Sequence, residues 1–513
     1  MIWRVPTAAV PFLLFFFALF IRLFFASLLP FPGLDDPPFY LTVARNLAED
    51  RGLVIDAIWS YLVPFRAVTH PSNEFWMPLP SLILAPFFKI LGPELSVAQT
   101  IGAVAGALLA PIAWKTAAVV QVEASAHKND TRISGVPFVS GLLIAVNPLL
   151  AYQAVSSDSS VYFTLFAASA LLAANALPFF AGFLAGFAYL ARTEGALLAA
   201  LLMVRDRSAK RAGAVLLGAG LVAIPWLTRN YSTFGTAIPV PVTSLMLLPD
   251  YSALFTYGGA PSPIDWGNQV ALRVQAAGAS LGLVLVQALV FPLTPLAVAG
   301  YVAARSSRLV DRGIFAFAGV FLLSILLFPV PVLHGTFYHS VGAFLPLLAT
   351  LAVMGLLRLG HAAGRRLYQG GSFTAVILCG AGLLLTFVQL GLAAGAASEL
   401  HTRWAAQFET AASWLSTRAV REAREALPQA LGHSTGPVMT NEPHTLHYAS
   451  GVPTVMLPWG DPPESAKEVT LRYGVQHIVG FGRFGRYPDA LDEHGAFHKL
   501  FEENGVWAYE IVR

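Results

Sequence analysis

The stretch Leu34-Asp35-Asp36-Pro37-Pro38-Phe39-Tyr40 follows the first long apolar run of the chain, and the expected fold is organised around it. It opens a segment, residues 30–77, that also contains Ala44-Arg45-Asn46-Leu47-Ala48 and Thr69-His70-Pro71. A carboxylate beside a bilayer is costly unless it faces water, a partner or a substrate. Two adjacent carboxylates at this point therefore predict that the segment is the floor of an active site and that the apolar helices are its scaffold.

The composition is that of a polytopic α-helical membrane protein. Of the 513 residues, 56% are hydrophobic and only 12% are charged, and the mean hydropathy is +0.63. Soluble domains carry roughly twice that share of charge. The net charge of +3 is too small to predict a nucleic acid partner. The single cysteine, Cys379, excludes a disulfide framework and a cysteine metal site.

Apolar runs long enough to cross a lipid bilayer predict about 11 transmembrane helices. The first covers residues 6 to 29; it is expected to remain uncleaved, and Arg22 near its far end is expected to snorkel outward. The later runs cover about 94–120, 135–153, 160–176, 180–204 as a hairpin, 212–228, 276–303, 313–331, 340–357 and 373–396.

The basic residues predict which loops face the cytoplasm. If Arg4 is cytoplasmic, an alternating path places the basic loops 121–134, 205–211, 304–312 and 358–370 inside. The same path places the Asp35-Asp36 loop, Asp158 and everything after about residue 397 outside. We therefore expect a multi-pass protein of the cytoplasmic (inner) membrane whose candidate site is extracytoplasmic.

Residues 397–513 differ in composition, since they hold many of the charges and no long apolar run. Glu399 to Leu427 predicts an amphipathic helix, and the short strand-like runs that follow predict a small α/β domain. The expected organisation is a transmembrane core over 1–396, with a first extracytoplasmic loop at 30–77, and an extracytoplasmic α/β domain over 397–513.

Asp35 and Asp36 carry the strongest single signal. They are interpreted as a general base, or as an electrostatic anchor for a sugar or metal. The alternative is a solvated loop or a helix N-cap, because Pro37-Pro38 suits a first helical turn. Asp158 lies in a Ser-rich turn where helix capping is again the alternative. The predicted topology places it on the same side as Asp36.

Other polar groups are expected on this side of the membrane. Arg192, Glu194 and Arg229 interrupt apolar helices at their outer ends. They are interpreted as a structural ion pair or as side chains that snorkel outward. The alternative is a phosphate clamp, because a planar guanidinium matches phosphate oxygens. The remaining candidates are interpreted as scaffold residues or as ligands of a metal or phosphate: His70, His334, Tyr338 and His339.

The chain resembles the lipid-phosphosugar-dependent glycosyltransferases of the C superfamily over nearly its whole length. Within that superfamily it is most similar to relatives of the protein O-mannosyltransferases and of the lipid A aminoarabinose transferase. The Trp-Trp-Asp signature of oligosaccharyltransferases is absent, which disfavours transfer of a whole glycan to asparagine. The resemblance is carried by the motifs already quoted from residues 34–71 and by Tyr189-Leu190-Ala191-Arg192-Thr193-Glu194-Gly195, Pro225-Trp226, Arg229-Asn230-Tyr231 and Phe337-Tyr338-His339.

The resemblance implies an inverting glycosyltransferase that moves a sugar from a polyprenyl-phosphate donor to an extracytoplasmic glycan, lipid or protein hydroxyl. It implies Asp36 as the general base, with Asp35 beside it, because Asp36 lies about eight residues before the alanine of the Ala-Arg pair. Two positions depart from the family pattern: Pro37-Pro38 follow Asp36, and aspartate stands at 158 where relatives often have glutamate.

The remaining roles follow from this resemblance. The donor phosphate is expected to contact Arg192, Arg229, Tyr338 and His339. The acceptor or sugar is expected near Asp158, His70 and Glu194. The expected cofactor is an optional divalent cation, Mg²⁺ or Mn²⁺, with Asp36 and Asp158 as its candidate ligands. The main alternative function is a transporter or flippase of a lipid-linked sugar, against which the absence of a visible internal repeat counts.

Overall fold

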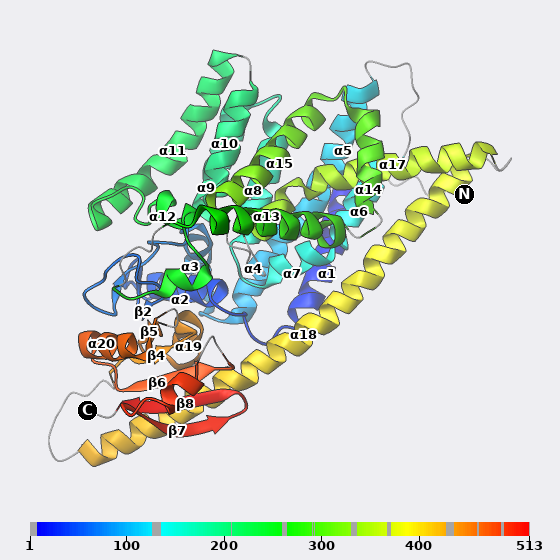
Figure 1. Ribbon diagram of the computed structural model, residues 1–513. Coiled ribbons are helices and arrows are strands. Elements are labelled where there is room, and N and C mark those ends of the chain that lie inside the picture. Colours follow the sequence, from blue (N-terminus) through cyan, green and yellow to red (C-terminus); the bar gives the residue numbers. More distant parts are fainter. Residues whose placement is uncertain are drawn as a thin grey trace.

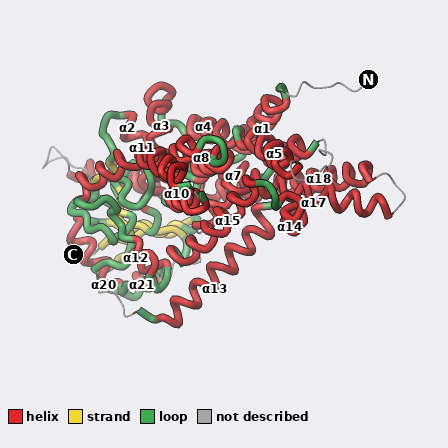
Figure 2. Tube along the Cα trace, turned by 90° about the horizontal axis from the view of Figure 1, so that it is seen from above, coloured by secondary structure: helices red, strands yellow, loops and turns green. Residues whose placement is uncertain are grey.

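The computed structural model describes residues 8–125, 135–206, 208–258, 264–289, 291, 293–329, 336–366, 371–426, 436–458, 461–483 and 487–511. Figure 1 shows a bundle of helices in its upper part, a sheet in its lower part, and α2, α3 and the first loop between the two. Figure 2, seen from above, shows that helices make up most of the molecule and that the strands gather at one side.

The helices of the first half of the chain include α2, which lies within the first loop. They are α1 (Val10–Ala26), α2 (Asp36–Ala48), α3 (Leu79–Leu91), α4 (Leu95–Ala107), α5 (Leu109–Ser125), α6 (Val136–Ala145), α7 (Pro148–Val155), α8 (Ser160–Ala173), α9 (Pro178–Ala191), α10 (Glu194–Arg205) and α11 (Ala209–Phe234). The second half adds α12 (Val242–Met246), η1 (Tyr251–Phe255), α13 (Trp266–Gly282), η2 (Leu283–Ala288), α14 (Leu293–Ala304), α15 (Arg308–Leu327), α16 (Thr336–Ser340), η3 (Val341–Phe344), α17 (Leu345–Arg366), α18 (Gly371–Ala426), α19 (Pro443–Ser450), α20 (Pro463–Tyr473) and α21 (Asp489–Asp492).

The apolar helices are those of a multi-pass membrane protein. Within the described residues, six helices are long and apolar enough to cross a membrane, or seven if the bent pair α6 and α7 is one span. Five further apolar helices are shorter, with 10–17 residues. A helix needs about 20 residues to cross the hydrocarbon layer at 1.5 Å per residue. The predicted count of about 11 spans therefore stays a prediction.

Arg22 lies inside the helical bundle and is fully buried, so the prediction that it snorkels outward is wrong. Its guanidinium donates to the carbonyls of Ala145 and Ile144 at 3.1 and 3.4 Å. Those carbonyls end α6, where the chain bends by 49° into α7, and the last carbonyls of a helix have no partner within it. Arg22 thus stabilises the break after which α7 leads to Asp158.

A six-stranded sheet has the order β2-β5-β4-β6-β8-β7. The first four strands are parallel to one another, and β8 pairs antiparallel with both β6 and β7. Strand β2 comes from the first loop and pairs with β5 from the C-terminal part of the chain. The strands are β1 (Val54–Ile55), β2 (Ala57–Ile58), β3 (His70–Pro71), β4 (Val438–Thr440), β5 (Thr454–Met456), β6 (His477–Phe481), β7 (Phe497–Glu503) and β8 (Val506–Ile511).

Helix α18 connects the helical bundle to the sheet, and Figure 1 shows it as one long rod (in yellow) beside both. It runs past position 397 without interruption, so the predicted division of the chain at 396/397 falls within a helix. His401 on α18 is fully buried and bonds the carbonyl of Phe31 and the hydroxyl of Tyr152. It therefore ties together the two segments that lead to Asp36 and to Asp158.

Candidate active site

Asp36 is the first residue of α2, and Pro37-Pro38 form the first turn as the sequence predicts. Asp35 occupies the N-cap position, but its side chain makes no capping hydrogen bond. Instead, the Asp35 carboxylate accepts the indole N–H of Trp59 at 3.3 Å, and Asp36 Oδ1 accepts that of Trp76 at 2.7 Å. Two tryptophans of the first loop thus orient the two carboxylates.

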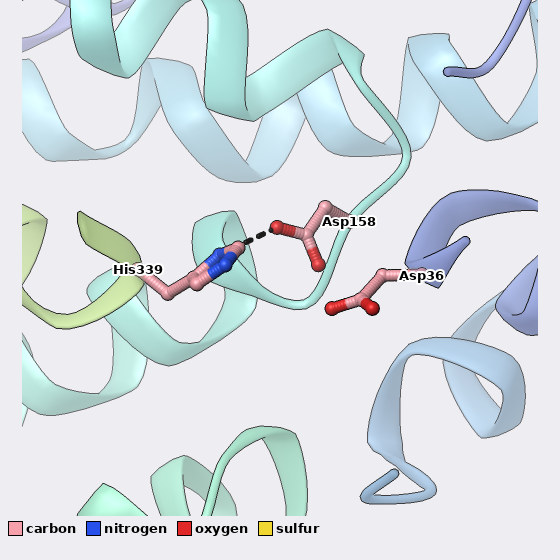
Figure 3. A group of neighbouring side chains, drawn as sticks. All are labelled: Asp36, Asp158 and His339. Atoms are coloured by element: carbon pink, nitrogen blue, oxygen red, sulfur yellow. Dashed lines mark hydrogen bonds and ion pairs between the residues drawn. The ribbon is translucent and has the colours of Figure 1, made fainter. Parts of the chain in front are cut away.

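Asp158 lies in the turn between α7 and α8, and α16 brings His339 to it. His339 Nδ1 is 2.9 Å from Asp158 Oδ2, and a dashed line marks this contact in Figure 3. The Ser160 hydroxyl donates to the same carboxylate oxygen at 2.6 Å. The Ser159 hydroxyl donates to Asp158 Oδ1 at 3.0 Å. In Figure 3, Asp36 comes from a separate segment and faces Asp158. The structure therefore brings the three residues into one group.

Arg192 and Glu194 flank the junction of α9 and α10 and join the same network. Arg192 Nε donates to Glu194 Oε1 at 3.2 Å, and Arg192 Nη1 donates to the Ser159 hydroxyl at 3.0 Å. The Ser340 hydroxyl donates to Glu194 Oε1 at 2.8 Å. The Arg192–Glu194 ion pair thus holds Ser159 and Ser340, the residues that follow Asp158 and His339. This arrangement is compatible with both interpretations of Arg192, structural pairing and phosphate binding.

A cavity of about 430 Å³ opens beside this network. Its polar wall includes Asp36, Glu74, Arg192, Glu194 and His339. The rest of the lining includes four polar residues, Asn73, Thr193, Asn230 and Ser324, but is mostly aromatic and aliphatic. The apolar part comes chiefly from the first loop, the segment 237–254 and the end of α15, and includes Trp59, Phe75, Trp76, Trp226, Ile238, Val240, Leu245, Tyr251, Leu323, Leu327 and Phe328. A largely apolar cavity with a few convergent polar groups is typical of a small-molecule site.

Five predicted site residues lie outside the lining of this cavity. Asp35 and Asp158 belong to the network beside it, whereas His70, Arg229 and Tyr338 are held elsewhere. The ring nitrogens of His70 contact the carbonyls of Pro71 and Ala57 at 2.9 and 3.1 Å. Arg229 donates to the Ser72 carbonyl at 3.0 Å, and the backbone carbonyl of Tyr338 accepts from Gln153 at 2.9 Å. His334 lies outside the described residues.

Several residues of the first loop that line the cavity were not among the sequence-based candidates, and they include Trp59, Glu74 and Trp76. The signal that could have indicated them is the run Glu74-Phe75-Trp76, an acidic residue followed by two aromatic ones shortly after Thr69-His70-Pro71. Aromatic residues near a bilayer are also interpreted as interfacial anchors, which is why the run does not by itself indicate a site.

The environments of Asp36 and Asp158 push their pKa values in opposite directions. Burial and the charge of Asp158 raise the pKa of Asp36, against the opposing effects of His339, Arg192 and the Trp76 indole. Burial also favours a higher pKa for Asp158, but His339, Arg192 and Ser160 outweigh it, and the net pKa is lowered. Burial and the charge of Asp36 raise the pKa of Asp35 to about 7. Asp36 is thus the better proton acceptor, and Asp158 stays charged.

Asp36, Asp158 and His339 also form a candidate cation site, because one ligand atom from each lies within 4.8 Å of the others. Two carboxylates and an imidazole suit a divalent transition metal, whereas Mg²⁺ is usually bound through carboxylates and water. Both oxygens of Asp158 already accept hydrogen bonds.

No protein-family model and no curated protein matches the chain. Among solved structures, it is similar to the Archaeoglobus fulgidus oligosaccharyltransferase tethered with an acceptor peptide, with a TM-score of 0.55 and 13% identity over 99% of this chain and 74% of that one. It is similar to ArnT from Cupriavidus metallidurans bound to undecaprenyl phosphate, with a TM-score of 0.55 and 13% identity over 98% of each chain. For ArnT in the apo state the TM-score is 0.52. The chain thus shares the overall fold of these solved structures, in agreement with the fold that the resemblance predicted.

Proposed function

We propose that the protein is an inverting membrane glycosyltransferase that moves a sugar from a polyprenyl-phosphate donor to an extracytoplasmic acceptor hydroxyl. The observation that carries the proposal is that the pKa values of two neighbouring carboxyl groups are shifted in opposite directions, upward for Asp36 and downward for Asp158. The two groups lie beside a cavity that Arg192 also lines. The fold shared with ArnT, whose structure was solved with undecaprenyl phosphate bound, supports a lipid-linked donor.

In the proposed reaction, the acceptor oxygen attacks the anomeric carbon, and the bond between that carbon and the phosphate oxygen breaks. Asp36 takes the proton of the acceptor hydroxyl, and polyprenyl phosphate leaves as an anion. Arg192 and His339 line the cavity and are proposed to contact this phosphate. Asp158 and Glu194 hold these two groups in place, and Asp35 adds negative charge beside the base.

A divalent cation is proposed as an optional cofactor, with Asp36, Asp158 and His339 as its ligands. When bound, such an ion would stabilise negative charge on the leaving phosphate. We further propose that the site faces the extracytoplasmic side of the inner membrane, and that residues 397–513 shape acceptor access.

The test compares purified wild-type and Asp36→Asn protein with polyprenyl-phosphate sugars and a broad acceptor panel. Acceptor-dependent release of polyprenyl phosphate by the wild type, reduced about 10³-fold in the variant while the donor still binds, would support the proposal. Equal release by both proteins, or donor binding without release by either, would contradict it and favour a transporter of the lipid-linked sugar.

A further inference from the structure

Glu74 is an acidic residue of the cavity wall that takes no part in the network around Asp158. It lies between Asn73 and Phe75, which line the same cavity. One of its carboxylate oxygens, Oε2, is buried and has no hydrogen-bond partner among the residues that the structure describes. A buried acceptor without a donor is unfavourable. A ligand that enters the cavity is therefore expected to supply the donor.

The residue before Glu74 has a positive φ angle, as do the residues before Asp36 and Asp158. Asn73, Asp35 and Ser157 have φ angles of 69°, 56° and 61°. Such angles are rare outside glycine and persist at functional sites when the surroundings hold them. Asn73 is held in this way: its side chain accepts from the Ser72 hydroxyl at 2.7 Å and donates to the Trp76 carbonyl at 3.2 Å.

The charge next to Glu74 favours a neutral donor over a cationic one. Arg229 and His70 both lie close enough to stabilise the charged Glu74 carboxylate, although burial raises the pKa of this group overall. No hydrogen bond or ion pair joins Arg229 to Glu74 in the described part of the chain. An ammonium group placed at Glu74 would face the repulsion of Arg229. A hydroxyl would not.

The neighbouring rings suit a sugar. Phe75 and Trp76 lie with ring centroids 5.2 Å apart, and Trp59 lies 5.0 Å from Phe75. All three line the cavity, so they offer aromatic surface to the C–H face of a sugar ring, while Glu74 offers an acceptor to its hydroxyls. We propose that Glu74 accepts a hydrogen bond from a hydroxyl of the sugar carried by the donor, and thereby determines which sugar is transferred.

This inference rests on the proposed function and adds a specificity-determining residue to it. The experiment uses full-length protein in nanodiscs with undecaprenyl phosphate that carries mannose, glucose or arabinose. The donor from which undecaprenyl phosphate is released fastest in the presence of acceptor identifies the parent sugar. Donors that carry the monodeoxy analogues of this sugar are then tested. The variants are Glu74→Ala and Glu74→Gln. The control is Asp50→Asn, since Asp50 is exposed and pairs with Lys89 at 2.7 Å.

The wild type is expected to lose about 100-fold in kcat/KM with one monodeoxy sugar, because the missing hydroxyl leaves the Glu74 acceptor unpaired. Glu74→Ala is expected to lose about 100-fold with the parent sugar and to treat the parent and that analogue alike. Glu74→Gln, which keeps one acceptor oxygen, is expected to retain more activity than Glu74→Ala. Asp50→Asn is expected to discriminate as the wild type does.

Two outcomes would overturn the inference. In the first, Glu74→Ala loses activity equally with every sugar and keeps the discrimination of the wild type, which indicates a structural role. In the second, it loses discrimination among deoxy acceptors instead, which assigns Glu74 to the acceptor.

If the wild type transfers no sugar, the proposed function fails and the same lipids test Glu74 by thermal stabilisation. The parent lipid should then stabilise the wild type more than one deoxy lipid does, and this difference should vanish in Glu74→Ala. A difference of the same size in both proteins, or none in the wild type, would overturn the inference.

Discussion

The hydroxyl oxygen of Thr445 accepts the backbone N–H of Asp35 at 3.1 Å, although 410 residues separate the two in sequence. Asp35 has φ 56° and ψ −90° and directly precedes Asp36. The Thr445 hydroxyl also donates to Glu442 Oε2 at 3.2 Å. A side chain of α19, next to the sheet, thus holds the strained backbone from which the proposed base projects.

Replacement of Thr445 by Val should lower kcat about tenfold, because the Asp35 N–H loses its acceptor and Asp36 is held less firmly. The measurement is the rate of polyprenyl phosphate release at saturating donor. Thr470→Val is the matched control, since Thr470 is also buried and its hydroxyl donates to the Ala466 carbonyl of its own helix. Equal losses in both variants would show that Thr445 acts through stability alone.

Replacement of Trp76 by Phe should make activity more sensitive to acid. The Trp76 indole donates to Asp36 and lowers its pKa, so loss of this bond raises the pKa of Asp36 further. A base must be deprotonated to accept a proton. The rising limb of the pH profile of kcat should therefore move to higher pH, with activity at its acidic end falling about tenfold.

Trp59→Phe is the control for this shift, since its indole donates to Asp35 instead. The pH profile is measured for the wild type and both variants with the same donor. An unchanged limb in Trp76→Phe would contradict the assignment of Asp36 as the base.

Arg192 and Arg229 are both predicted from the sequence to contact the donor phosphate, but their replacement should affect activity differently. Arg192 lines the cavity, so Arg192→Gln should lower kcat about 100-fold and raise the KM for the donor through lost phosphate stabilisation. Arg229→Gln should lower kcat much less, because Arg229 donates to the Ser72 carbonyl and packs on Trp226. Stabilisation by undecaprenyl phosphate in thermal unfolding provides the independent measurement. Similar losses in both variants would argue for a phosphate contact by Arg229.

Removal of divalent cations should lower activity if Asp36, Asp158 and His339 hold a metal. Mn²⁺ should then restore activity more fully than Mg²⁺, because one ligand is an imidazole. The measurement is release after dialysis against EDTA and titration with each ion. His339→Ala should require more Mn²⁺ than the exposed control His498→Ala. Full activity after exhaustive chelation would exclude a metal requirement.

Much of the architecture is local in origin and was predicted from the sequence. Apolar runs indicate membrane helices because burial of apolar side chains in lipid depends on each run itself. Pro37-Pro38 marks the start of α2 because proline suits the first turn of a helix. The sequence-based candidates that the structure brings together at one site are Asp36, Asp158, Arg192, Glu194 and His339.

The sequence by itself therefore determined that this is a polytopic α-helical membrane protein, where its apolar helices lie, and which polar residues near their ends are candidates for the site. Only the tertiary structure decided which candidates meet. His339 lies against Asp158 across 181 residues of sequence, while His70 is turned to backbone carbonyls and Arg229 lies outside the lining. The physical reason is that helix packing and the pairing of β2 with β5 set these distances through contacts distant in sequence, which no local pattern records.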